Sequence, residues 1–193
     1  AERQYRFPLE YGGQRTPTAQ WTVTGSGALI IGQKEKAPFI NSVTFGEITD
    51  YDIKDANNMG AAMAPSAAST LKNFFEDTNT KPQDYDVIYT GDLGSVGTQL
   101  LYELMDREGY DLRCKHSDCG SLIFDGDKQD THAGGSGCGC SASVLASFIM
   151  HRFESGDFKN ILFMSTGALM SPTSSFQGES IPGISHLLNI KID

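Results

Sequence analysis

The segment from residue 85 to 109 constrains the fold most strongly, because a short apolar run, a glycine turn and an amphipathic pattern follow one another there. Residues 85–90 are typical of a buried strand, and the next seven residues include three glycines. Apolar residues recur at helical spacing from about residue 98 to 108, and Gly109 then ends the pattern. A strand leading through a turn into a helix is one arm of a β-α-β unit, so the sequence predicts a layered α/β fold.

Other runs extend this alternation along the chain. After an irregular arm over residues 1–18, strands are expected over 19–24, 28–31, 39–48, 122–124, 160–166 and 186–192. The first two could equally be one strand with a glycine bulge. Helices are expected over 61–77 and 142–154, with the buried face of the second carrying Leu145, Phe148, Ile149 and Phe153. Pro65 fits the first of these helices only in its first turn. Residues 50–60, 126–131 and 171–182 are expected to form loops.

Length and charge bound the function. A chain of 193 residues forms one domain and can bury a core without disulfides or a metal. Its net charge of −9 and the lack of a basic stripe argue against nucleic acid as a partner. No apolar run reaches the length of a membrane span, and the first ten residues do not resemble a signal peptide. The four cysteines are therefore expected to be reduced thiols in a cytosol-like compartment.

The run 134–140, Gly-Gly-Ser-Gly-Cys-Gly-Cys, is the most unusual motif, and a helix is expected to follow it. Such a turn aims backbone N–H groups and a helix start at one point, an arrangement that suits an anion. A tight turn that lets the helix pack closely on a sheet is the alternative. The run is neither a Walker loop nor a dinucleotide fingerprint, since no Gly-Lys-Ser/Thr follows it and no strand is expected before it.

Three further features carry candidate chemistry. Cys138 could be a nucleophile with His132 or His116 as its base, although we favour a packing role for the thiol. The spacing of the cysteines and histidines matches no familiar zinc pair, so no metal site is predicted. Gly91 and Asp92 directly follow a strand, at the sheet edge where ligands bind in open α/β folds. Asp92 is expected either to contact a ligand there or to cap the next helix.

Six stretches together resemble one known family, that of stage V sporulation protein AD. They are residues 18–28, 58–65, 85–94, 134–142, 166–172 and 177–182. The resemblance implies a thiolase-like fold, with layered β-α-β-α-β halves that each hold a sheet between helices. Residues 1–50 would be the arm and end of the first half, with 18–31 as its crossing strand, and 51–193 would be the second half. Without the rest of the first half, an apolar face would be exposed.

The resemblance also implies a role. Members take part in sporulation and spore germination by binding dipicolinic acid and moving it into the developing spore. The implied partners are dipicolinic acid or its calcium chelate and other proteins of the stage V sporulation A operon. The complete protein would be a homodimer, peripheral to the spore inner membrane. Ketoacyl synthases of the related type III kind place a His near Gly91 or Asp92 and an Asn near Cys138, and neither is kept here. We therefore expect no enzyme and no cofactor, with a thiolase-like acyltransferase and a scaffold for membrane partners as alternatives.

Dipicolinate carries two carboxylates, so a chain of net charge −9 needs local donors to bind it. The candidate donors are the backbone N–H groups of the glycine loop, His116, His132, or Arg113 and Lys115. We expect the glycine loop and a nearby histidine to form the pocket floor. Ca²⁺ could instead bridge the ligand to protein carboxylates, since it takes oxygen ligands. The ligand-binding residues predicted in this way are Gly91, Asp92, His116, His132, Gly135, Ser136, Gly137 and Cys138.

Overall fold

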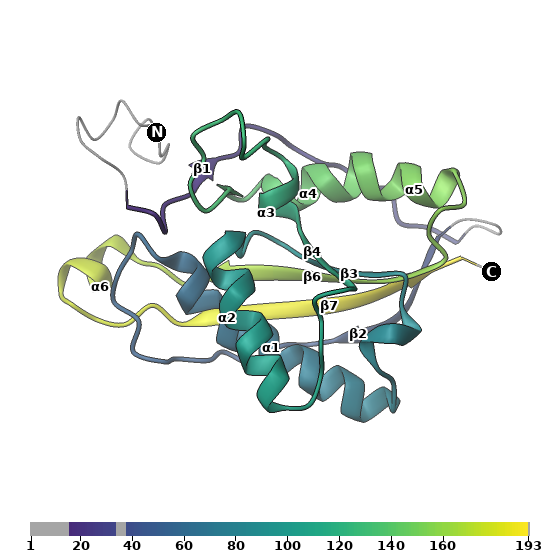
Figure 1. The fold of residues 1–193 in the computed structure, drawn as a ribbon, viewed down its shortest axis with the longest axis horizontal. Helices are drawn as coiled ribbons and strands as arrows, with labels where there is room; N and C mark the ends of the chain where they lie inside the picture. Colours follow the sequence, from purple (N-terminus) through teal and green to yellow (C-terminus); the bar gives the residue numbers. More distant parts are fainter. Residues whose placement is uncertain (1–15, 34–37, 193) are drawn as a thin grey trace.

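A five-stranded mixed sheet with helices on both faces forms the centre of the molecule (Figure 1). The computed structural model describes residues 16–33 and 38–192. Its strands run in the order β2 (Phe39–Thr44), β7 (Gly183–Lys191), β6 (Asn160–Ala168), β3 (Val87–Thr90) and β4 (His116–Asp118). Strands β4, β3 and β6 are parallel, while β7 is antiparallel to both β6 and β2. The predicted α/β class, with a sheet between helices, is confirmed.

Helices α1 (Met59–Thr78) and α2 (Gly94–Arg107) cover one face of the sheet (Figure 1). Five apolar residues of α1 recur at helical spacing and are all buried: Met63, Ala67, Leu71, Phe74 and Phe75. They pack with Leu101 and Met105 of α2 and with Leu162 of β6. Helix α1 starts at Met59, so Pro65 lies in its second turn and not in the first. Because proline has no N–H, the carbonyl of Ala61 lacks its helical donor.

The opposite face carries one continuous helix, made of α4 (Cys140–Val144), the π-helical turn η4 (Leu145–Ile149) and α5 (Met150–Glu154). Leu145, Ile149 and Phe153 pack on strand residues that include Ile161, Phe163 and Ile190. Phe148, predicted to be buried, is 39% exposed and contacts the guanidinium of Arg152. The π turn widens the spacing of helical residues, which an ideal 3.6-residue period does not anticipate.

The first predicted strands are wrong in part. Only β1 (Trp21–Thr22) is a strand, and it pairs in parallel with β5 (Gly135–Ser136) in a second, two-stranded sheet. The expected crossing strand 18–31 therefore does not join the central sheet. Residues 28–31 form no strand. Gly27, just before them, lies against the backbone of Ala142, where a Cβ on Gly27 would come within 2.0 Å of the carbonyl oxygen. Residues 1–15 of the arm predicted over 1–18 lie outside the described residues.

Other short elements also differ from expectation. Residues 122–124 are not a strand, because Asp118 caps a short helix, α3 (Cys119–Leu122), by accepting a hydrogen bond from Ser121 N–H. The expected loop 171–182 contains α6 (Pro172–Phe176), with proline at its start. A 3₁₀ turn, η3 (Pro82–Asp84), precedes β3. The aliphatic side chains at 29–31 are exposed, with Ile30 and Ile31 at 102% and 82%.

Candidate functional site

The carboxylate of Asp92 lies at the carboxyl end of β3 and accepts three hydrogen bonds. Its Oδ2 accepts from the Ser136 hydroxyl at 2.8 Å and from Gly137 N–H at 3.0 Å. Its Oδ1 accepts from the Thr166 hydroxyl at 3.0 Å. We call these three donors and the space between them the Asp92 cradle. Asp92 does not cap helix α2, so of its two expected roles the capping role is wrong.

Close backbone approaches position the Asp92 cradle. A Cβ at Gly91 would lie 2.7 Å from the Thr166 hydroxyl oxygen, so only glycine brings β3 this close to β6 at that point. Gly137 has a φ of +128°, which an L side chain rarely adopts. The buried side chain of Gln20 donates to the carbonyls of Asp92 and Gly135 at 2.9 and 3.1 Å. The arm leading into β1 therefore ties the turn after β3 to β5.

The glycine loop 134–140 offers the cradle fewer donors than expected. Besides the Ser136 hydroxyl, the loop gives the Asp92 carboxylate one backbone donor, Gly137 N–H, whereas Cys140 N–H bonds to the carbonyl of Gly137. Gly135 and Ser136 form the short strand β5. The sequence predicts no strand before this run and none within it. Gly139 packs against residue 25, where a Cβ would lie 2.0 Å from the carbonyl oxygen. Close packing, the alternative considered for these glycines, therefore accounts for part of the motif.

His116 lies in β4 and belongs to a separate chain of hydrogen bonds. The Thr90 hydroxyl donates to Asp118 at 2.7 Å, so its oxygen accepts from His116 Nε2–H at 2.9 Å. The Tyr102 hydroxyl then donates to Nδ1 at 3.1 Å. Burial of the neutral imidazole lowers the pKa of His116 to about 4. His116 is thus committed to Tyr102 and Thr90 and does not face the glycine loop.

Asp118 ends that chain and fixes the start of α2. Its carboxylate is 3% exposed and accepts from the N–H groups of Leu93 and Gly94 at 2.9 and 3.0 Å. Burial raises the pKa of the Asp118 carboxyl, while these donors and Thr90 act in the opposite direction. Asp118, unrecognised in the sequence, therefore performs the capping role expected of Asp92.

His132 is exposed and has a φ of +50°. Its Nδ1 lies 2.7 Å from the carbonyl oxygen of Thr16, and its Nε2 lies 2.9 Å from a carboxylate oxygen of Asp130. Both ring nitrogens are engaged on the outer side of the loop. The structure therefore brings Gly91, Asp92, Ser136 and Gly137 together, with Gly135 beside them, but neither histidine.

The cysteines divide into two kinds. Cys138 is exposed beside the Asp92 cradle, and Cys114 is also exposed. Cys119 and Cys140 are fully buried, and burial raises the pKa of Cys140 to about 12 and that of Cys119 further. Neither histidine is within hydrogen-bond contact of Cys138 in the described part of the chain, which gives the thiol no base. No cluster of three or more metal-ligating side chains occurs among residues 16–33 and 38–192.

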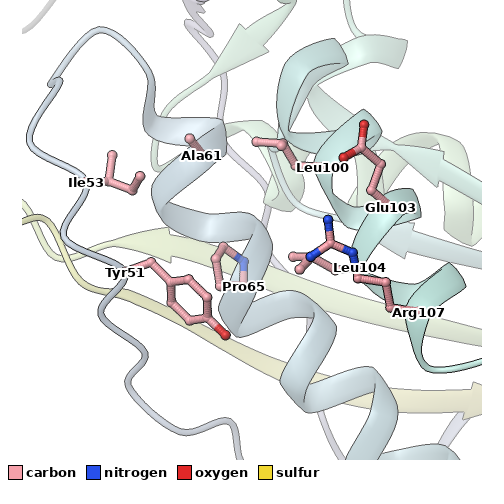
Figure 2. Close-up of a pocket in the computed structure, with 8 residues that line it drawn as sticks. All are labelled: Tyr51, Ile53, Ala61, Pro65, Leu100, Glu103, Leu104 and Arg107. Atoms are coloured by element: carbon pink, nitrogen blue, oxygen red, sulfur yellow. The ribbon is translucent and has the colours of Figure 1, made fainter.

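A concave site separate from the Asp92 cradle lies between α1, α2 and the segment that precedes α1 (Figure 2). Its volume is about 340 Å³, and it is lined by Tyr51, Ile53, Ala61, Pro65, Leu100, Glu103, Leu104 and Arg107. Leu100 and Leu104 belong to the apolar pattern of α2 but are only half-buried, because they line this cavity. Within the described ranges, no helix is both long and apolar enough to span a membrane.

Sequence reasoning missed Thr166, which is a donor of the cradle, and Gln20, which holds the backbone beside it. Thr166 lies near the carboxyl end of β6, directly beside β3 in the sheet. A polar residue near the end of a second buried strand was the signal available, since carboxyl ends of parallel neighbours meet at one edge. Gln20 offered no such signal, because its contacts reach residues 72 and 115 positions away.

Comparison with solved structures finds enzymes of low similarity to this chain. One is the priming β-ketosynthase from the R1128 polyketide biosynthetic pathway, with 12% identity and a TM-score of 0.43 over 84% of this chain and 52% of that one. Another is 3-oxoacyl-[acyl-carrier-protein] synthase III from Aquifex aeolicus VF5, with 11% identity and a TM-score of 0.40 over 82% and 54%. These identities are too low to carry an activity across.

Sequence comparison is far more specific. The chain is 48% identical over 186 residues to stage V sporulation protein AD of Bacillus subtilis (strain 168), which covers 96% of this chain and 55% of the relative. It therefore spans about half the length of that curated relative. Residues 1–191 also match the sequence profile described as Stage V sporulation protein AD. Together these matches confirm the resemblance seen in the motifs: the chain belongs to the stage V sporulation protein AD family.

Proposed function

We propose that this chain forms the dipicolinate-binding part of a non-catalytic protein that acts in dipicolinate uptake into the developing spore. The observation that carries the proposal is the Asp92 cradle, where two hydroxyls and one backbone N–H converge on a carboxylate. It lies at the carboxyl end of β3, the edge where ligands bind in open α/β sheets. Membership of the sporulation family supplies the biological setting.

The charge around the site bears on the form of the ligand. The chain has a net charge of −9, and the cradle already holds the carboxylate of Asp92. A free dicarboxylate would meet repulsion at this point, while its calcium chelate has that charge neutralised. We therefore propose dipicolinic acid or its calcium chelate as the ligand, to be separated by titrations with and without Ca²⁺.

The proposed absence of catalysis rests on the site chemistry. The positions that the family resemblance assigns to a condensing His and Asn fall near Asp92 and Cys138, where an acid and an exposed thiol stand. A thiolase-like acyltransferase would need an activated nucleophile, and the described histidines are bonded elsewhere. Thioester turnover by the family-length protein would contradict this part of the proposal.

A scaffold is the second candidate function. The exposed aliphatic residues at 29–31 and the cavity between α1 and α2 favour it, since such surfaces fit protein partners. We propose other stage V sporulation A operon proteins as these partners, a homodimer for the family-length protein, and a location peripheral to the spore inner membrane. A scaffold without ligand affinity would give no heat with dipicolinate.

Calorimetry with dipicolinate tests the proposal. Gly137→Val should weaken binding about tenfold or more, because valine at a φ of +128° reorients the N–H donor. His132→Ala should leave the affinity unchanged, because both ring nitrogens of His132 contact other partners, Thr16 and Asp130. Gly156→Val is the matched control, since Gly156 also has a positive φ, +79°, but has open space around it. Unchanged affinity in Gly137→Val would contradict the proposed site.

A further inference from the structure

The donors of the Asp92 cradle bind a carboxylate, and that carboxylate is the protein's own Asp92 side chain. Three uncharged donors surround Asp92, at 2.8, 3.0 and 3.0 Å. The structure pairs Asp92 with no lysine, arginine or histidine among the described residues. We propose that the cradle is a carboxylate-binding site kept closed by Asp92, and that a ligand carboxylate enters by replacing the Asp92 side chain. The proposal rests on the proposed function only in naming dipicolinate as the entering ligand.

Strand pairing positions these donors independently of the Asp92 side chain. Ser136 lies in β5, which is paired with β1, and the Ser136 carbonyl accepts from Val23 N–H at 2.8 Å. Thr166 lies in β6 and is in register with Ser185 of the long antiparallel strand β7. The turn at Asp92 is itself held through its backbone, by Gln20 at its carbonyl and by Thr166 at its N–H. The three donors should therefore keep their places when the carboxylate leaves.

The cradle also lies within reach of solvent. Asp92, Gly137 and Thr166 are half-buried, and the neighbouring Cys138 is exposed. A small carboxylate can thus approach without opening the core. While Asp92 occupies the donors, the fraction of molecules with an open cradle limits the apparent affinity, so a cradle open one-tenth of the time weakens binding about tenfold.

A variant that empties the cradle tests the proposal directly. Asp92→Ala should be less stable than the wild type, and its melting temperature should rise saturably with sodium formate but not with sodium chloride at equal ionic strength. Asp92→Asn is the matched control, because its amide fills the same space and formate should not affect it. Adding Ser136→Ala to Asp92→Ala should remove most of the formate effect, since it deletes one donor. A folded Asp92→Ala without a formate-specific rise would overturn the proposal.

The same variant answers the question if it does not fold unaided. Refolding of Asp92→Ala should then give more soluble, native protein in formate than in chloride. Equal yields in the two salts would overturn the proposal, because a donor set that recognises a carboxylate must stabilise the folded chain when formate binds.

Dipicolinate binding separates this proposal from the proposed function. Asp92→Ala should bind dipicolinate at least about tenfold more tightly than the wild type, because the competing carboxylate is gone. Equal or weaker binding would overturn replacement, and a loss confined to Ca²⁺-containing buffer would identify Asp92 as a cation bridge instead. If formate stabilises Asp92→Ala while dipicolinate binds neither protein, the cradle stands and the proposed function fails.

Discussion

Truncation of Asp118 should destabilise the chain severely, because its carboxylate holds the start of α2 and the end of β3 together. Asp118→Ala removes the acceptor for the Thr90 hydroxyl and for the N–H groups of Leu93 and Gly94, at 2.7, 2.9 and 3.0 Å. Each buried donor left without a partner costs about 1–3 kcal/mol. Relief of the cost of burying the carboxylate offsets part of this, so we expect a net loss of about 3–4 kcal/mol.

Urea unfolding followed by circular dichroism measures this loss. A domain is typically stable by about 5–15 kcal/mol, so Asp118→Ala should remain folded in buffer but unfold at a much lower urea concentration. Asp157→Ala is the control, because Asp157 also accepts two side-chain hydrogen bonds, from Arg152 and Ser155, but at the surface. Its midpoint should barely change. A loss below about 1 kcal/mol in Asp118→Ala would refute the role assigned to this carboxylate.

Three further predictions concern acid stability, backbone strain and thiol reactivity. The pKa of His116, about 4 in the folded chain, lies below its ordinary value, so His116 contributes stability above pH 6.5 that is lost as the pH falls toward 4. Asp118, with its raised pKa, acts in the opposite direction. Urea unfolding at pH 7 and at pH 4 measures both effects together, and the part of the stability loss that is absent in His116→Gln, about 2–3 kcal/mol, belongs to His116. Gly94→Ala should cost about 2 kcal/mol or more in urea unfolding, since φ is +65° and the new Cβ would lie 2.3 Å from the Ala133 carbonyl oxygen. Gly109→Ala, with φ +85° and open space, should cost less, and equal losses would contradict the steric argument. Ellman's reagent should titrate two thiols in the native chain, Cys114 and Cys138, and the other two only after unfolding; four native thiols would contradict the burial of Cys119 and Cys140.

Long periodic segments made the fold class predictable from sequence. The helical spacing of Met63, Ala67 and Leu71 and the strand–turn–helix unit around Gly91 match the structure because each pattern depends on contacts nearby in the chain. The predictions that failed concern segments whose secondary structure depends on contacts with residues far away in the chain. Residues 28–31 have a strand-like composition, but they follow Gly27, which lies against Ala142 of α4, and their aliphatic side chains are exposed. The strand at Gly135 and Ser136 is two residues long and exists through pairing with β1, more than a hundred positions away.

The candidate site shows the same division. Gly91 and Asp92 were found because strand ends mark a sheet edge, and Ser136 and Gly137 because the glycine loop is unusual. His116 and His132 were included for their chemistry alone, and tertiary contacts commit each of them elsewhere. Asp118 escaped notice because Asp92 stands before helix α2 and seemed the nearer cap by sequence, while the actual acceptor lies 24 positions beyond Gly94.

The most direct test of dipicolinate binding at the Asp92 cradle is a titration followed by ¹⁵N–¹H NMR. We predict that the amide signals of Ser136 and Gly137 shift saturably as dipicolinate is added, with and without Ca²⁺. The signals of Leu100 and Leu104, which line the separate cavity, should stay in place. Shifts confined to the cavity residues, or no saturable shift at Gly137, would contradict the account.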